Sequence, residues 1–429
     1  MSERSLHRGL GGFDVLGITV NNVVGAGIFG LPAALAAAAG NLSIAAVVAT
    51  MLVIAMMAVC LIEVASRYDV TGGPMHYAGV AFGPTAGFAV GWLMYLTRLS
   101  AFGAIAAVML DYAGGFWPAL GSGAGRAAAI TVFIVTLAAL NLRGAAHGAL
   151  VSHVLTVAKL VPLIALAAVG IGRGGWDSLP AEGPASLGAF SQALLIAFFA
   201  CMGFEQGAVI AGEVKHPNRS LPFGIVGGVV IVGVLYILLM LASFALVPDL
   251  ARSTRPLADA AASLLGPIGA TVMSFTAVVS AGGGLSVSML VAPRVLYALG
   301  AHGDFPSVLT RLAPVRRTPF VAIVTNAALV WLLTITGTFV YLATFSVVAR
   351  ILMYVSTCLA LIALRRRDGP APIKIPLGPL WAVIATVASL ATLATTTGAA
   401  VRDVLIALAA GALIRMAVRR RFQHPASSG

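Results

Sequence analysis

Runs of apolar residues recur along the whole chain, many of them about twenty residues long, the length of a helix that crosses the hydrocarbon core of a bilayer. Only 9% of the 429 residues are charged, whereas a soluble domain has roughly a quarter of its residues charged. Hydrophobic residues make up 60% of the chain and the mean hydropathy is +1.01. No water-soluble core could take up this much apolar surface, so the sequence predicts an all-α polytopic membrane protein.

The length rule places about twelve transmembrane helices along the chain. They are expected at residues 13–38, 41–66, 84–113, 126–142, 148–171, 188–212, 222–247, 265–300, 318–336, 338–364, 379–398 and 401–418. The tails 1–12 and 419–429 are short and polar. The first apolar run exceeds the roughly 7–15 residues of a signal-peptide core and further spans follow it, so we expect no cleavable signal.

Basic residues gather in alternate loops of this arrangement, which explains a net charge of +12 without nucleic acid. The loops on the side of the termini carry Arg4, Arg8, Arg67, Arg143, Lys215, Arg219, Arg311, Arg316, Arg317, Arg365, Arg366, Arg367, Lys374, Arg419, Arg420 and Arg421. The opposite side carries Arg126, Arg173, Arg252, Arg255 and Arg402. The positive-inside rule therefore predicts a multi-pass protein of the cytoplasmic (inner) membrane with both termini in the cytoplasm. The basic loops suit anionic lipid headgroups.

The middle of the first span contains three glycines and a proline, reading Val-Gly-Ala-Gly-Ile-Phe-Gly-Leu-Pro over residues 24–32. In a helix interior glycine costs about 1 kcal/mol and proline about 3 kcal/mol, so the helix opens most easily here. Freed backbone groups at membrane depth must face protein or water. The amides of residues 26–29, at the positive end of the second half-helix, suit a carboxylate. A glycine-faced packing contact between helices explains the pattern equally well, and this alternative stays open.

The sixth span has a similar interruption, with Gly203, Glu205 and Gly207 in an apolar run. Two interrupted spans, five apart, form the pair expected of a transporter built from inverted repeats. An acid at mid-membrane is energetically costly and usually functional, which makes Glu205 a site candidate. A purely structural role, in which Glu205 bonds the unwound backbone without touching substrate, stays open.

Three motifs in order resemble the amino acid-polyamine-organocation permeases. They are GAGIFGLP in the first span, FFACMGFEQGAVIAGEVKHPNRSLP in the sixth and PRVLYALGAHGDFP at the end of the eighth. The resemblance implies a LeuT-like fold of two inverted five-helix repeats, here residues 13–175 and 185–366, followed by two extra helices at 376–418. Helices one and six are discontinuous in such a fold. It also implies secondary transport of amino acids or amines by alternating access, without a cofactor.

The resemblance implies a substrate site at the two interrupted helices. The α-carboxylate would lie on the turn at Gly25, Ala26 and Gly27, next to Ile28. The α-amino group would meet carbonyls near Phe199, Ala200 and Gly203, with Phe199 as a lid over the substrate. Relatives often have an aromatic residue where this chain has Cys201 and Met202, so the pocket wall differs in shape. We expect Gly27→Val to block binding and Gly87→Val, outside the motif, to leave it intact.

Cationic residues within other spans are further candidates. Lys159, in the fifth span, can lose its proton near neutral pH in apolar surroundings, as a proton-coupled carrier requires. In similar sodium-independent permeases a lysine here takes the place of a sodium ion and joins the fifth span to the first. Arg350 lies at an equivalent depth in the tenth span and is expected to brace packing or pair with Glu205. Arg98, in the third span, is a second buried cation of unassigned partner, and Tyr95 beside it is a candidate pocket residue.

Other classes of function fit the sequence less well. No GxxxxGK[ST] motif, HExxH motif or nucleophile-base pair is present, so neither direct use of ATP nor an enzyme is indicated. Cys60, Cys201 and Cys358 lie in apolar runs without metal-binding spacing. A sensor or channel on the same fold, or a carrier of polyamines or cationic amino acids, stays open. Because only Glu205 is placed to neutralise a cationic side chain, the sequence favours neutral amino acids, with proton symport or exchange.

Overall fold

The computed structural model describes residues 11–68, 73–143, 149–172, 183–184, 186–209, 214–314, 318–394 and 398–423. Its regular elements in the first half are α1 (Gly12–Val23), α2 (Gly27–Ala39), α3 (Ser43–Ala65), α4 (Gly73–Phe82), α5 (Pro84–Ala113), α6 (Gly123–Arg143) and α7 (Ala149–Ile171). The second half has α8 (Leu187–Cys201), α9 (Gln206–Val209), α10 (Pro217–Leu246), α11 (Pro256–Ala301), α12 (Phe320–Thr336) and α13 (Phe339–Asp368). Two further helices follow, α14 (Gly378–Ala394) and α15 (Gly398–Gln423). The all-helical polytopic fold is thus confirmed.

The helices follow the predicted spans closely, with two additions. Helix α4 lies in the loop before α5 and packs on it, and its ten residues are too few to form a span. Helix α11 bends at Gly266, which has φ 62° and ψ −149°. A positive φ is accessible to glycine at little cost, so the segment before Gly266 forms a separate helical arm ahead of the predicted span. The apolar pattern gives no sign of that arm.

Six stretches of described chain are long and apolar enough to cross a membrane: Gly27–Ala65, Pro84–Ala113, Gly123–Arg143, Pro217–Leu246, Pro256–Ala301 and Phe339–Asp368. Shorter apolar helices cover Lys159–Ile171, Leu187–Cys201, Phe320–Thr336 and Gly378–Ala394. Large apolar side chains such as Val132, Ile268 and Phe275 are exposed on the outer surface. A bilayer would cover these side chains, because lipid tails are as apolar as they are.

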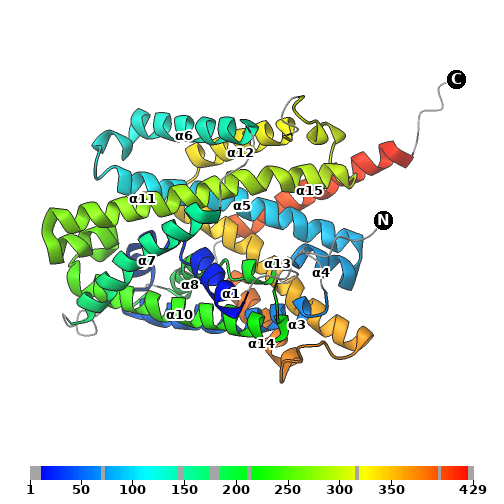
Figure 1. Ribbon diagram of the computed structural model, residues 1–429, viewed down its shortest axis with the longest axis horizontal. Coiled ribbons are helices and arrows are strands. Elements are labelled where there is room, and N and C mark those ends of the chain that lie inside the picture. The colour runs from blue at the N-terminus through cyan, green and yellow to red at the C-terminus, as the bar shows by residue number, and fades with distance from the viewer. Residues whose placement is uncertain are drawn as a thin grey trace.

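Short helices α1 and α8 lie in the middle of the bundle, with α7, α10 and α13 around them (Figure 1). Helices α6 and α12 pack side by side along one long edge (Figure 1). Helix α13 packs along α5, and α10 packs along α1. The interrupted helices are therefore surrounded by continuous ones, and the polar backbone of their breaks is shielded from lipid.

Ion pairs that join distant segments fasten the ends of several helices. Glu63, at the end of α3, is fully buried, and Arg365 of α13 donates to both of its carboxylate oxygens at 2.5 Å. Glu63 also accepts a hydrogen bond from the amide of Ile375 at 2.9 Å. Asp304, after α11, pairs with Arg415 of α15 at 2.7 Å. A buried charge that loses its partner costs about 3–5 kcal/mol, so these pairs hold α14 and α15 against the rest of the bundle.

Candidate substrate site

The first span is broken between α1 and α2, at Val24, Gly25 and Ala26. Within this break the amide of Gly25 donates to Val23 at 2.7 Å, and the amide of Phe29 donates to Ala26 at 3.2 Å. The amides of Ala26, Gly27 and Ile28 make no backbone hydrogen bond outside the helices in the described chain, and no side chain caps the helix. The amides of these three residues are therefore available to a ligand, as predicted. The amide of Phe29 was also predicted to be available, and this is corrected because it donates to the carbonyl of Ala26.

The sixth span is broken between α8 and α9, at residues 202–205. Met202 is extended, with φ −84° and ψ 157°, and Gly203 has φ +122°. The amide of Gly203 turns away from the helix and donates to Glu205 Oε2 at 3.1 Å. In a continuous helix that amide would bond the carbonyl four residues earlier, that of Phe199. The break therefore leaves the Phe199 carbonyl available to an ammonium group.

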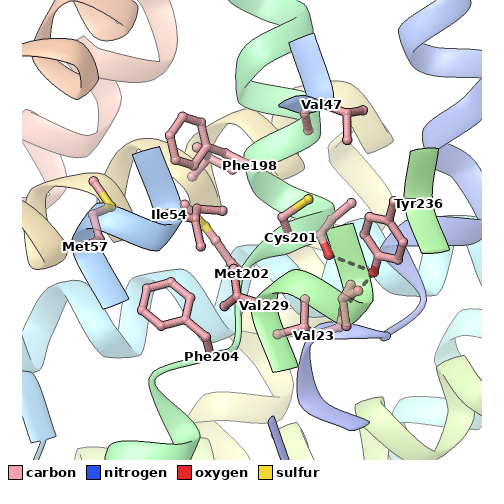
Figure 2. Packing of buried hydrophobic residues seen from close by; sticks show 14 of the residues in the cluster. Val23, Val47, Ile54, Met57, Phe198, Cys201, Met202, Phe204, Val229 and Tyr236 are labelled. Carbon is pink, nitrogen blue, oxygen red and sulfur yellow. Dashed lines mark hydrogen bonds between the residues drawn. The ribbon is translucent and has the colours of Figure 1, made fainter. Parts of the chain in front are cut away.

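The two breaks touch each other. A methyl group on Gly203 would lie 2.7 Å from the carbonyl oxygen of Asn22, and one on Gly27 would lie 3.0 Å from Cα of Ala200. The hydroxyl of Tyr236, on α10, is fully buried and shares a hydrogen bond between the carbonyls of Val23, at 2.9 Å, and Ala200, at 3.0 Å. Figure 2 shows this hydroxyl between the end of α1 and the end of α8. One side chain thus joins both breaks.

Lys159, on α7, contacts the first break. Its Nζ donates to the backbone carbonyl of Asn21 at 2.9 Å, and the residue is buried. Asn21 lies near the end of α1, where the helix begins to open. The structure therefore shows the predicted connection between the fifth span and the first, and the role of Lys159 in coupling remains a prediction.

Glu205 lies at the centre of a polar cluster in the second break. Its Oε2 accepts a hydrogen bond from the hydroxyl of Tyr354, on α13, and its Oε1 lies 3.9 Å from the guanidinium of Arg350 on the same helix. Glu205 and Tyr354 are both buried, and the Tyr354 ring packs 4.9 Å from that of Phe204. The expected pairing of Arg350 with Glu205 is therefore present.

Phe199 points toward the opposite end of α13. Its ring lies edge-on to that of Phe339, with centroids 5.9 Å apart. It is half-buried, whereas Ala200 is buried. A side chain held this way, one turn before the break, can cover a ligand that reaches the Phe199 carbonyl. The predicted lid function is consistent with this placement and stays a prediction.

Gly87 is tightly packed, which makes Gly87→Val a poor control for Gly27→Val. A methyl group there would lie 3.0 Å from Cα of Gly79 and 3.3 Å from the carbonyl oxygen of Met75. Gly87 is therefore a close contact between α5 and α4, and Gly87→Val would disturb packing. Gly17 is a better control for Gly27, because it lies on α1 and nothing approaches its position within 4 Å.

The sequence analysis missed three tyrosines that hold the interrupted helices. Besides Tyr236 and Tyr354, Tyr112 of α5 donates to the carbonyl of Phe29 at 2.8 Å and accepts from the amide of Leu257 at 3.2 Å. All three are almost fully buried. A tyrosine within a long apolar span needs a hydrogen-bond partner, and that cost is the one signal in the sequence that distinguishes these residues from ordinary packing.

A membrane-embedded bundle with two interrupted helices in contact, one presenting amides and the other carbonyls, has the architecture of the LeuT-like fold. The solved structure of MhsT, in complex with L-phenylalanine, has this fold: it aligns with a TM-score of 0.57 over 92% of this chain and 100% of MhsT, at 17% identity.

The chain belongs to the amino acid permease family, whose model matches residues 10–414. The serine/threonine exchanger SteT of Bacillus subtilis is 27% identical, covering 89% of this chain and 90% of SteT. The b(0,+)-type amino acid transporter 1 of Mus musculus is 28% identical, covering 88% and 80%. The methylthioribose transporter of B. subtilis is 24% identical, covering 98% and 95%. The protein is thus a multi-pass membrane protein of a family of amino acid transporters and not of enzymes.

Proposed function

We propose that the protein is a sodium-independent secondary carrier that moves amino acids across the cytoplasmic membrane by alternating access, with both termini in the cytoplasm. The observation that carries this proposal is the contact between two helix breaks of opposite polarity, joined by Tyr236. Serine/threonine exchange by SteT and amino acid transport by the mouse relative support the substrate class.

The breaks suit the two charged ends of a free amino acid. The amides of Ala26, Gly27 and Ile28 donate hydrogen bonds to the α-carboxylate, because they lie at the positive end of α2. The carbonyl of Phe199 accepts the α-ammonium group. A substrate bound this way contacts both breaks at once, so its binding energy favours one arrangement of α1 and α2 relative to α8 and α9. A ligand with different affinities for two arrangements shifts the equilibrium between them.

Lys159 supports sodium independence. Its ammonium group donates to the carbonyl of Asn21, next to the break in the first span. Without this lysine, a bound cation would be needed there to hold the opened backbone. The carrier then runs by proton symport or by exchange of one amino acid for another. We propose Lys159 and Glu205 as the groups that take part in proton coupling.

Charge argues against cationic substrates. Glu205 is already engaged by Tyr354, Arg350 and the amide of Gly203, so it does not offer a free carboxylate to a lysine, arginine or polyamine. The sequence analysis favoured substrates with neutral side chains for the same reason, the scarcity of acids near the site. That scarcity is equally compatible with an anionic side chain.

The test is uptake of labelled amino acids into liposomes containing the purified protein. We expect saturable uptake that continues when choline replaces sodium, and that accelerates when unlabelled substrate is preloaded. Loss of uptake in choline would overturn sodium independence. Flux that does not saturate would indicate a channel, and binding without flux would indicate a sensor.

A further inference from the structure

Two arginines and one carboxylate form a charged cluster between α5, α13 and the second break. Arg98 lies midway along α5 and Arg350 midway along α13, and both interact electrostatically with each other and with Glu205. The two helices are fastened beside Arg98, where the hydroxyl of Ser346 donates to the carbonyl of Thr97 at 3.2 Å. The positions of the charges are therefore set by packed helices.

The cluster has one positive charge too many. Glu205 has its two oxygens turned to Arg350 and to Tyr354. Arg98 makes no hydrogen bond or ion pair with any residue that the structure describes, although it is half-buried and repelled by the positive charge of Arg350.

The other acids of the described chain are engaged elsewhere. Their partners are Gly11 for Asp14, Arg365 for Glu63, Arg126 for Asp111, Arg252 for Asp249, Ser253 for Asp259, Arg415 and Arg419 for Asp304, Arg367 for Asp368, and Arg402 for Asp403. None of them is available to Arg98. A charge that is largely removed from water and has no partner is unfavourable, and arginine keeps its charge at any physiological pH.

A second polar group on the same face of α5, which is fully buried, also lacks a partner. Tyr95 precedes Arg98 by three residues, so the two side chains lie one above the other on the helix. The Tyr95 side chain is fully buried and stacks on Trp92, and its hydroxyl has no hydrogen-bond partner in the described chain. Buried polar groups normally have such partners. Tyr95 and Ala26 of the first break belong to one cluster of buried residues, which extends from α5 to the first break.

We propose that the substrate carries a second carboxylate, as glutamate and aspartate do, and that Arg98 binds it with help from the Tyr95 hydroxyl. This inference rests on the proposed function and narrows its substrate class. A neutral amino acid has no net charge and leaves Arg98 unpaired. An acidic amino acid brings one negative charge, which balances the cluster. A guanidinium also matches a carboxylate geometrically, because its parallel N–H groups bond both oxygens.

The test compares ligands that differ only in that charge. Glutamate and glutamine, and aspartate and asparagine, are matched in shape, and each competes against labelled substrate in liposomes. We expect the wild-type protein to bind the acid at least about tenfold more tightly than its amide, since a hydrogen bond to a charged group is worth about 1.5–3 kcal/mol. Equal affinity for acid and amide, or tighter binding of the amide, would overturn the proposal.

Variants of Arg98 sharpen the result. Arg98→Gln should bring the acid-to-amide affinity ratio to about one, and Arg98→Lys should keep part of the preference because it keeps the charge. Arg402→Gln, at an exposed arginine, should leave the ratio unchanged. If Arg98→Gln does not fold, the wild-type ligand pairs still decide the matter. An unchanged ratio in a folded Arg98→Gln protein would contradict the assignment to Arg98.

An inorganic anion is the other source of a negative charge at Arg98. Binding is therefore repeated with gluconate replacing chloride. Acid preference that persists in gluconate supports the proposal, and binding of a neutral amino acid that requires chloride would overturn it. Saturable uptake of neutral amino acids alone would refute this inference and leave the proposed function standing. Absence of uptake for every amino acid would refute the proposed function itself.

Discussion

The two helix breaks both open the backbone inside the bundle, but different side chains stabilise them. At the first break no acid is present among the residues that the structure describes, and the opened end of α1 is held by a lysine that donates to the carbonyl of Asn21. At the second break Glu205 lies within the opened segment itself and is held by Tyr354 and Arg350. In each case the cation comes from a neighbouring continuous helix, α7 for the first and α13 for the second.

The difference between the breaks indicates that each binds a different end of the substrate. The first break has unused amides and a short link from α1 to α2, so it is free to accept a carboxylate. In the second break the amide of Gly203 donates to the side chain of Glu205, and the carbonyl of Phe199 is available to an ammonium group. We therefore expect the second break to tolerate change least, because its geometry depends on a glycine with positive φ and on a buried acid.

The largest effect is expected for Gly203→Ala. The residue has φ +122°, and the new methyl group would lie 2.7 Å from the carbonyl of Asn22. Backbone strain and overpacking each cost about 1–3 kcal/mol, so the total should reach about 4 kcal/mol. The melting temperature of the purified protein measures the loss. Gly282→Ala is the control, since nothing lies within 4 Å of that position, and a similar loss in both variants would refute the assignment.

The next largest effect is expected for Gly27→Val, which tests the contact of the first break with α8. Its methyl groups would press on Ala200, whose Cα lies 3.0 Å from the position of the first added carbon. We expect a loss of up to about 3 kcal/mol in substrate binding. Gly17→Val, on exposed α1 surface, should bind normally. Equal affinities in the two variants would show that the breaks need not touch.

Lys159→Met separates the cation of the first break from its packing. Methionine keeps most of the chain length and loses the charged hydrogen bond to Asn21, which is worth about 2 kcal/mol. Uptake should fall by about thirtyfold, as 1.4 kcal/mol corresponds to a factor of ten. Lys374→Met, at an exposed lysine, serves as the control. Normal uptake by Lys159→Met would contradict the view that Lys159 holds the first break as Arg350 holds the second.

The smallest effect is expected for Tyr236→Phe, which cuts the link between the breaks without opening a cavity. The carbonyls of Val23 and Ala200 lose a shared donor, and we expect about 1 kcal/mol of destabilisation. Tyr297→Phe, on α11, is the matched control because its hydroxyl makes no hydrogen bond with described residues. If uptake and melting temperature were the same for both variants, the breaks would act independently of Tyr236.

Much of the architecture followed from the sequence by itself. Apolar run length is a local property, and lipid requires helices that satisfy their own backbone. The spans, the break at Gly25–Gly27 and the break near Gly203 could therefore be predicted without coordinates. Glycine, proline and an intramembrane acid change local helix stability, so they are visible in a single stretch of chain.

Only the tertiary structure decided which residues meet across the bundle. Lys159 contacts Asn21, and Arg98 interacts electrostatically with Arg350, across more than a hundred residues of chain. The hydroxyl of Tyr236 is shared between carbonyls at the ends of two other helices. No periodicity records such pairings, because they depend on how helices rotate and cross. The same reason hid the close packing of Gly87, a glycine outside any motif that contacts the backbone of α4, a helix that the apolar pattern did not predict.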